Sequence, residues 1–243
     1  MSGQSFLETR GLVKEYRNRR VVDQVNLQVL SGSVVGLLGP NGAGKTTTFS
    51  SIVGFIRPTS GAIFLDEEDI TALPIHQRAA RGITYLAQEP SVFKKLTVEE
   101  NIRIVLEPLG LSAGEIKSRI GELLAELKIE RLAGNKGHAL SGGERRRVEI
   151  MRALATRPRF ILLDEPFAGV DPLSVADLQQ IIRDLKQKGL GVLISDHNVR
   201  ETLQVCDFAY IMNNGQILTS GVAADIIESV VARKMYLGDN FHM

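Results

Sequence analysis

The sequence predicts an α/β fold in which a mostly parallel sheet is flanked by helices and interrupted by a helical lobe. Two observations support this prediction. Before residue 89 and after residue 155, short β-branched apolar runs alternate with segments of helical periodicity, which is typical of parallel sheets. Between these parts, residues 89–155 lack strand signals and carry helix-start patterns instead.

The composition allows a sizeable core and limits the classes of partner. The chain has 243 residues, of which 44% are hydrophobic, and a net charge of +1. This charge gives no general attraction to nucleic acid or anionic membrane. The single Cys206 cannot form an internal disulfide, which fits a reducing compartment. No signal peptide and no run of about 18 apolar residues is present, so we expect no direct membrane span.

Three short apolar runs are predicted to be buried strands. They are residues 34–39 (VVGLLG), 160–164 (FILLD) and 191–196 (GVLISD), which combine β-branched residues with flanking turn signals. Residues 172–189 lie between the last two and are predicted to form a helix that Gly189 ends. Its apolar positions, at helical spacing, are Leu178, Ile181, Ile182 and Leu185.

The middle of the chain is predicted to be helical. Thr97 with Glu100, and Ser112 with Glu115, have the spacing of capping boxes at helix starts. An apolar stripe at helical spacing follows the second box, and we interpret it as core packing rather than a cofactor site. Its residues are Ile116, Ile120, Leu123, Leu124 and Leu127.

Residues 39–47 (GPNGAGKTT) fit the pattern G-x-x-x-x-G-K-[ST] of a phosphate-binding P-loop. Glycines let backbone amides converge on phosphate oxygens, and the following helix adds the positive end of its dipole. Lys45 supplies a charge for the β- and γ-phosphates, and the Thr46 hydroxyl can bind Mg²⁺. A preceding strand and a following apolar segment favour this site over an ordinary Gly-rich turn. The predicted nucleotide-binding residues here are Gly39, Pro40, Asn41, Gly42, Ala43, Gly44, Lys45, Thr46 and Thr47.

Two adjacent acids follow the apolar run at residues 160–164. A parallel strand would deliver Asp164 and Glu165 to its carboxyl end, where ligand sites gather in open α/β sheets. Asp164 would hold Mg²⁺, and Glu165 would orient or deprotonate an attacking water as a general base. The alternative, a strand that ends in two solvated acids, is less favoured beside a P-loop.

Three further residues are ambiguous on their pattern alone. His197 follows a predicted strand and could reach a γ-phosphate, although a lone histidine is more often structural. Gln88 follows a plausible strand and could contact both Mg²⁺ and the attacking water. Tyr16 could stack on adenine, although its spacing alone favours ordinary packing.

Residues 140–150 (LSGGERRRVEI) look like a second anion site. Ser141 and Glu144 have capping-box spacing, and the two glycines between them leave backbone amides accessible to an anion. Within one chain this site is surplus, because the P-loop already binds phosphate. Residues 145–147 are arginines that oppose the helix dipole. They indicate either a surface that faces phosphates or a partner's acids, or a solvated face.

In order along the chain, Tyr16, the P-loop, Gln88, LSGGE, ILLDE, AGVD and His197 resemble the ATP-binding cassette ATPases. LSGGE is the discriminating stretch, because kinases, GTPases and helicases share the P-loop and the acids but lack it. The resemblance implies a P-loop NTPase (RecA-like) core with a mostly parallel sheet, an antiparallel β portion near the N-terminus and an inserted α-helical lobe. It implies one domain over residues 1–243, with a nucleotide-binding core at 1–88 and 156–243 and a helical subdomain at 89–155.

The same resemblance assigns roles to the ambiguous residues. Gln88 becomes a γ-phosphate-sensing glutamine and a further metal contact, His197 a switch histidine and Tyr16 the adenine-stacking aromatic. Asp171 becomes the aspartate of a loop that crosses between two cassettes.

Cassettes of this family pack head to tail, so each signature stretch closes over ATP bound to the other copy. This chain has one P-loop and one such stretch, which implies a homodimer with two composite sites. The signature residues acting in trans are Leu140, Ser141, Gly142, Gly143 and Glu144.

Four stretches, LSGGERRRVEI, DEPFAGVDP, DHNVRETL and the C-terminal YLGDNF, resemble the ATPase subunits of lipopolysaccharide exporters of Gram-negative bacteria. This resemblance implies ATP and Mg²⁺ as cofactors and ATP-driven extraction of lipopolysaccharide from the inner membrane. The implied partners are two transmembrane permease subunits and a bitopic membrane protein. The implied location is the cytoplasm, at the cytoplasmic face of the inner membrane.

Three alternatives remain open at this point, one of which is a stand-alone nucleotide switch that hydrolyses ATP with no membrane partner. ATPases of branched-chain amino acid importers share much of the cassette but tend to be richer in glutamine after LSGG. Cassettes of DNA repair or translation usually carry a second cassette or a long coiled coil, and this chain has neither, nor a basic nucleic-acid face. We therefore expect no nucleic-acid partner.

Residues 91–96 (SVFKKL) are the expected docking site for transmembrane subunits. Phe93 offers an apolar anchor and Lys94 a polar rim contact. The alternative is a solvated loop with one packed phenylalanine.

Overall fold

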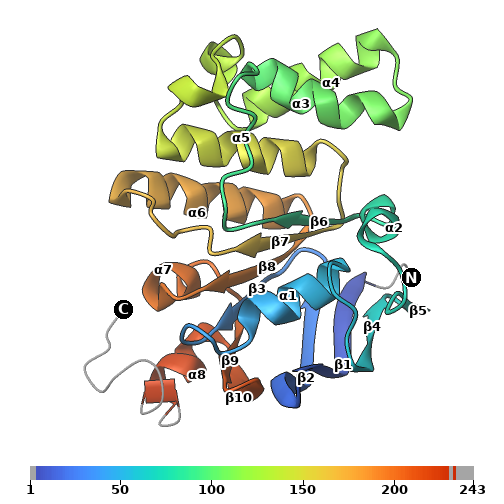
Figure 1. Ribbon diagram of the computed structural model, residues 1–243. Coiled ribbons are helices and arrows are strands. Elements are labelled where there is room, and N and C mark those ends of the chain that lie inside the picture. Colours follow the sequence, from blue (N-terminus) through green and yellow to red (C-terminus); the bar gives the residue numbers. More distant parts are fainter. Residues whose placement is uncertain (1–3, 230–231, 234–243) are drawn as a thin grey trace.

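The computed structural model describes residues 4–229 and 232–233. The YLGDNF stretch, at 236–241, lies outside the described residues. Two sheets and a helical lobe build the molecule, with the lobe at one end (Figure 1). The predicted α/β class is therefore confirmed, including the antiparallel portion near the N-terminus.

The larger sheet has six strands in the order β10-β9-β3-β8-β7-β6. Its members pair in parallel except β10, which is antiparallel to β9. The predicted buried strands lie next to one another at its centre, and every residue in them is buried. The strands are β3 (Val34–Leu38), β6 (Ile83–Leu86), β7 (Phe160–Asp164), β8 (Gly191–Asp196), β9 (Phe208–Asn213) and β10 (Gln216–Gly221).

The smaller sheet is antiparallel and has the order β2-β1-β4-β5. A tight hairpin joins β1 to β2, and its two turn residues, Arg17 (φ 46°) and Asn18 (φ 66°), are left-handed as the common hairpin turn requires. The strands are β1 (Phe6–Tyr16), β2 (Arg19–Leu30), β4 (Ser60–Leu65) and β5 (Glu68–Asp69).

Helix α1 (Lys45–Val53) joins the two sheets. Phe49 and Ile52 on α1 belong to one apolar cluster with Leu7 and Leu12 of the small sheet and Leu37 of the large sheet. Since α1 begins at the end of the P-loop, this packing anchors the loop to the core of the molecule.

Residues 89–155 contain no strand in the structure, as predicted. All three predicted capping boxes are present, at Thr97, Ser112 and Ser141. The predicted stripe that begins at Ile116 is buried, with no member more than 8% exposed. The lobe contains α3 (Val98–Leu106), α4 (Ala113–Glu126) and α5 (Gly142–Leu154), with 3-10 turns at Glu107–Leu109, Glu130–Leu132 and Gly137–Ala139.

The remaining helices flank the sheets. Helix α6 (Pro172–Gln187) lies between α5 and the large sheet in Figure 1, and its predicted apolar face is buried in the same cluster as the lobe's core. The others are α2 (Ile75–Ala80), α7 (Val199–Leu203) and α8 (Ala223–Glu228). Within the described residues, no helix combines the length and the apolar character that crossing a membrane requires.

Candidate nucleotide-binding site

The P-loop connects β3 to α1 at the carboxyl end of the large sheet. Gly44 caps α1 in a left-handed conformation with φ 109°, and a Cβ atom there would lie 2.4 Å from the carbonyl oxygen of Val21. Only glycine fits both constraints. The loop borders an open cavity of about 550 Å³. Its lining residues are Arg19, Val21, Asn41, Gly42, Gly44, Lys45, Thr46, Thr47, Gln88 and Glu165.

Lys45 is buried within the loop, 5% exposed. Its Nζ donates to the carbonyl oxygens of Gly39 at 2.7 Å and Pro40 at 3.1 Å. Burial lowers the Lys45 pKa, and the negative charges of Glu165, Asp164 and Asp196 oppose that shift. Lys45 also lines the cavity, so the structure places an ammonium group where it can meet a phosphate.

Asp164 ends β7 and is 1% exposed. Its Oδ2 accepts a hydrogen bond from the Tyr85 hydroxyl at 3.0 Å, and its Oδ1 accepts one from the Ser195 hydroxyl. Burial raises the pKa of Tyr85, so this hydroxyl remains a donor. Two hydroxyls from neighbouring strands thus hold both oxygens of the predicted metal ligand.

Sequence reasoning missed Tyr85 and Ser195. Ser195 lies directly opposite Asp164 in the parallel pairing of β7 with β8, and Tyr85 lies on β6, the other neighbour of β7. Their position beside Asp164 follows from the order and register of the strands, which cannot be derived from a single sequence.

Glu165 brings two of the predicted catalytic residues together. Its Oε2 accepts a hydrogen bond from Gln88 Nε2 at 2.9 Å and lies 3.3 Å from His197 Nδ1. Glu165 has φ 45°, a strained value for a residue with a side chain. This conformation turns the chain immediately after β7. The carboxylate, the glutamine amide and the imidazole consequently form one cluster beside the P-loop cavity.

Asp196, which sequence reasoning did not single out, is fully buried at the end of β8. Its Oδ2 accepts from the Phe167 amide at 3.2 Å and its Oδ1 from the Asn198 amide at 2.8 Å. Burial raises the Asp196 pKa, and these backbone hydrogen bonds oppose the shift. Asp196 therefore ties the loop after Glu165 to the segment that carries His197. The sequence pattern that could have identified Asp196 is an acid at the end of a predicted strand, immediately before His197.

The oxygen donors near the cavity fit Mg²⁺. Thr46 is exposed, and both Thr46 and Gln88 line the cavity. The Gln88 amide nitrogen donates to Glu165, so the amide oxygen is the atom that would face a cation. Asp164 adds a carboxylate at the end of β7, the strand next to β6. Hydroxyl, amide and carboxylate oxygens are the ligands that Mg²⁺ prefers.

Tyr16 and Asp171 lie away from the cavity lining. Tyr16 ends β1, is 47% exposed, and has Lys14 Nζ 4.9 Å from its ring centre. Its hairpin neighbours Arg19 and Val21 line the cavity, but Tyr16 does not. Asp171 caps α6, where its side chain accepts from the Ser174 amide at 3.0 Å.

The signature stretch begins α5. Leu140 is buried, whereas Ser141 and Gly142 are exposed, and Ser141 forms the capping box with Glu144. None of the five signature residues lines the P-loop cavity. A Cβ on Gly143 would lie 2.5 Å from the Ser174 hydroxyl, so this glycine permits the close approach of α5 to α6.

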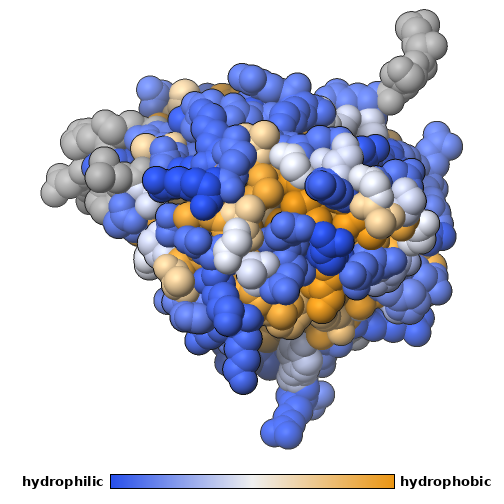
Figure 2. All heavy atoms as spheres, turned by 90° about the horizontal axis from the view of Figure 1, so that it is seen from above, coloured by the Kyte–Doolittle hydropathy of each residue, from blue (hydrophilic) through white to orange (hydrophobic). Residues whose placement is uncertain are grey.

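The predicted docking residues lie in the loop between β6 and α3. Phe93 is 46% exposed, with the Arg152 guanidinium 4.8 Å from its ring centre. The Lys94 carbonyl accepts from the His138 amide at 3.0 Å. Figure 2 shows the lobe end of the molecule, where hydrophobic patches lie among hydrophilic residues. The large exposed apolar residues within 89–155 are Phe93, Ile104, Leu109 and Leu111.

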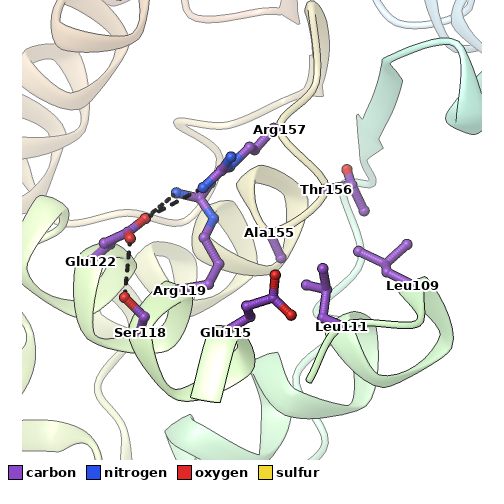
Figure 3. A pocket seen from close by; sticks show the side chains of 9 residues that line it. All are labelled: Leu109, Leu111, Glu115, Ser118, Arg119, Glu122, Ala155, Thr156 and Arg157. Carbon is purple, nitrogen blue, oxygen red and sulfur yellow. Dashed lines mark hydrogen bonds and ion pairs between the residues drawn. The ribbon is translucent and has the colours of Figure 1, made fainter. Parts of the chain in front are cut away.

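A separate hollow of about 290 Å³ lies in the lobe (Figure 3). Arg119 Nη1 pairs there with Glu122 at 3.1 Å, and Leu109 and Leu111 lie on the opposite side. The hollow contains none of the residues that the sequence predicts for the site.

Comparison with known proteins identifies related sequences over nearly the full length. The model of the ABC transporter family matches residues 22–168. The lipopolysaccharide export system ATP-binding protein LptB of Acidithiobacillus ferridurans is 57% identical, over 98% of this chain and 99% of that protein. The protein of the same name from Escherichia coli (strain K12) is 53% identical, also over 98% and 99%.

Solved structures agree with the sequence comparison. The ADP conformation of MJ1267, an ATP-binding cassette of an ABC transporter, has a TM-score of 0.88 at 31% identity and covers 98% of this chain and 100% of that one. The dimeric post-hydrolysis state of the cassette MJ0796, bound to ADP and Pi, has a TM-score of 0.79 at 25% identity, with 89% and 98% covered. From its P-loop geometry and these matches, the chain belongs to the ABC transporter family, as one of its ATP-binding cassettes.

Proposed function

We propose that this chain is the ATP-hydrolysing subunit of a lipopolysaccharide export system. The observation that carries the proposal is the 57% identity to a protein of that system over 98% of this chain. Identity at this level spans both the P-loop core and the lobe, which is the part expected to meet transmembrane subunits. No observation favours an amino acid importer or a non-transport cassette.

At the site, the P-loop amides and Lys45 bind the phosphates of ATP, and Tyr16 stacks on the adenine. Thr46, Asp164 and Gln88 provide oxygen ligands for Mg²⁺, which neutralises phosphate charge when bound. Tyr85 and Ser195 hold the Asp164 carboxylate in place by donating to its two oxygens.

Glu165 acts as the general base for the attacking water. Gln88 and His197 orient the Glu165 carboxylate. The supporting geometry is the cluster in which Glu165 Oε2 lies 2.9 Å from Gln88 Nε2 and 3.3 Å from His197 Nδ1. A base held by two neighbours has a defined direction toward the cavity, and positioning of this kind is a main source of catalysis in ATP hydrolysis.

Two copies of the chain form the working unit. The exposed positions of Ser141 and Gly142, away from the chain's own P-loop cavity, support a role in trans. Asp171 contributes to the crossing loop. The division into a core at 1–88 and 156–243 and a lobe at 89–155 gives each copy a nucleotide-binding part and a coupling part.

The coupling part meets two transmembrane permease subunits, and a bitopic membrane component completes the assembly. Phe93 and Lys94 form the contact with the permeases; the exposure of Phe93 supports this. The assembly works at the cytoplasmic face of the inner membrane. ATP binds the closed state more tightly than the open state, and this difference in affinity drives the change between them.

The direct test is co-purification of this chain from membranes, identification of its partners, and ATP-dependent release of lipopolysaccharide from proteoliposomes that contain the complex. We expect release with the wild-type chain and none with Lys45→Ala, which loses the phosphate-binding charge. A complex that hydrolyses ATP but moves an amino acid instead would overturn the proposal.

A further inference from the structure

Residues 87–93 connect the two functional regions of the chain. Gln88 lies at the P-loop cavity, and Phe93 lies exposed in the proposed docking loop. Three side chains of α5, at spacings of three residues, hold the backbone between these points. We call Arg146, Glu149 and Arg152 the backbone clamp.

Arg146 forms the end of the clamp nearest the nucleotide. Its Nη1 donates to the Ala87 carbonyl at 3.1 Å, and its Nη2 donates to the Asp164 carbonyl at 3.3 Å. These carbonyls belong to the residues immediately before Gln88 and Glu165. One buried guanidinium thus joins α5 to the backbone that positions both side chains.

Glu149 forms the centre of the clamp and is 3% exposed. Its Oε1 accepts from the Ser91 amide at 2.7 Å, and its Oε2 accepts from Arg146 Nη1 at 3.0 Å. A buried ion pair of this kind contributes little net stability compared with apolar residues of similar volume. The contacts instead support a role for Glu149 in fixing the position of the backbone at Ser91.

Arg152 forms the end of the clamp nearest the docking loop. Its Nη1 donates to the Ser91 carbonyl, and its guanidinium lies over the Phe93 ring. Burial lowers the Arg152 pKa, and the charge of Glu149 opposes that shift. The clamp is therefore positive, negative, positive along one face of α5, and it covers the segment from Ala87 to Phe93.

We propose that Glu149 is a positioning residue that makes residues 87–93 move together with α5. A displacement of Gln88 at the nucleotide then reaches Phe93 and the Ser141 end of α5 as one body, because a single helix (Gly142–Leu154) carries the clamp. The direction of this coupling, from ATP to a transmembrane partner, rests on the proposed function.

Two variants separate the clamp from the nucleotide contacts. Glu149→Ala removes the carboxylate. Ser91→Pro removes the amide donor and leaves the Glu149–Arg146 pair in place, so it tests the clamp without stranding a buried charge. Ser91→Ala is the matched control, because it keeps the backbone amide. None of these positions lines the P-loop cavity, so ATP affinity should stay within about twofold of wild type.

The first measurement is amide hydrogen exchange on the isolated chain with and without MgATP, in a Glu165→Gln background. In the parent chain and Ser91→Ala, ATP slows exchange through residues 88–96 and at the start of α5. In Glu149→Ala and Ser91→Pro, ATP still slows exchange near Gln88. We expect the ATP-dependent protection of the later residues of 88–96 and of the start of α5 to fall at least about fivefold. Equal ATP-dependent protection in all four chains would overturn the clamp.

The second measurement is the amount of lipopolysaccharide released per ATP hydrolysed by the complete complex. We expect this ratio to fall at least about fivefold in both clamp variants and to stay at the wild-type value in Ser91→Ala. A parallel loss of ATP affinity would instead indicate a purely structural role and overturn the proposal. If the wild-type complex releases no lipopolysaccharide, the proposed function fails, while hydrogen exchange still decides the clamp.

Discussion

Two adjacent acids at the end of β7 have different surroundings. Asp164 is buried, and hydroxyls of Tyr85 and Ser195 occupy both of its oxygens. Glu165 turns away with φ 45° and meets Gln88 and His197. The change of backbone direction between the two residues separates a rigid carboxylate suited to a cation from one that can reach water.

We predict that Glu165→Gln binds ATP normally but hydrolyses it at least about a hundredfold more slowly, because the amide cannot accept the proton. The closed dimer should accumulate and be visible by size-exclusion chromatography with ATP. Hydrolysis at the wild-type rate would show that Glu165 is not the base.

The end of α1 illustrates how one element depends on another. Arg78 on α2 is 1% exposed, and its Nη1 donates to the Ser51 and Ile52 carbonyls at 2.7 and 2.6 Å. Its Nε and Nη2 donate to the Leu73 and Thr71 carbonyls at 2.8 and 2.9 Å. Burial lowers the Arg78 pKa to about 10. The side chain remains a cation at neutral pH and satisfies the carboxyl end of the P-loop helix.

We predict that Arg78→Met lowers the free energy of unfolding by about 3 kcal/mol, because two buried and two part-buried carbonyls lose their donor. Chemical denaturation measures this change. Arg81→Met is the control, since Arg81 makes an exposed pair with Glu68 that is worth roughly 0–1 kcal/mol. Equal effects of the two substitutions would refute the role assigned to Arg78.

At the scale of the whole molecule, one apolar cluster runs from the lobe through α6 to the large sheet, and a second joins that sheet to the small one through α1. The P-loop and the signature stretch therefore stand on a common framework, yet Ser141 and Gly142 are exposed and outside the P-loop cavity. A second copy of the chain is the partner that this arrangement fits.

We predict that Ser141→Arg abolishes hydrolysis while leaving ATP binding to a single chain intact, because the arginine would obstruct the partner's nucleotide. ATPase assays and titration with a fluorescent ATP analogue measure the two effects. Ser112→Arg is a matched control, since Ser112 caps α4 with the same capping box but lies outside the proposed interface. Loss of ATP binding by monomeric Ser141→Arg would argue against the role in trans.

Local patterns made several features predictable. Capping boxes need only residues three apart, so Thr97, Ser112 and Ser141 were identifiable as helix starts and the structure has them there. Fully buried parallel strands need continuous apolar runs, so residues 160–164 and 191–196 were predicted with the bounds that the structure has. The P-loop is predictable for the same reason, because its glycines and its lysine lie in one contiguous stretch of the sequence.

Short-range patterns were therefore enough to predict the α/β class, the helical lobe and the loop that we propose binds phosphate, since each follows from local periodicity or a contiguous stretch of residues. The pairing of Ser195 with Asp164 and the burial of Arg146 against Ala87 are visible only in the folded chain. The sequence allowed Arg146 to face phosphates, a partner or solvent, and its burial in the chain's own interior was not among these readings. Such contacts depend on strand register and helix packing between residues far apart in the chain, and no local pattern encodes them.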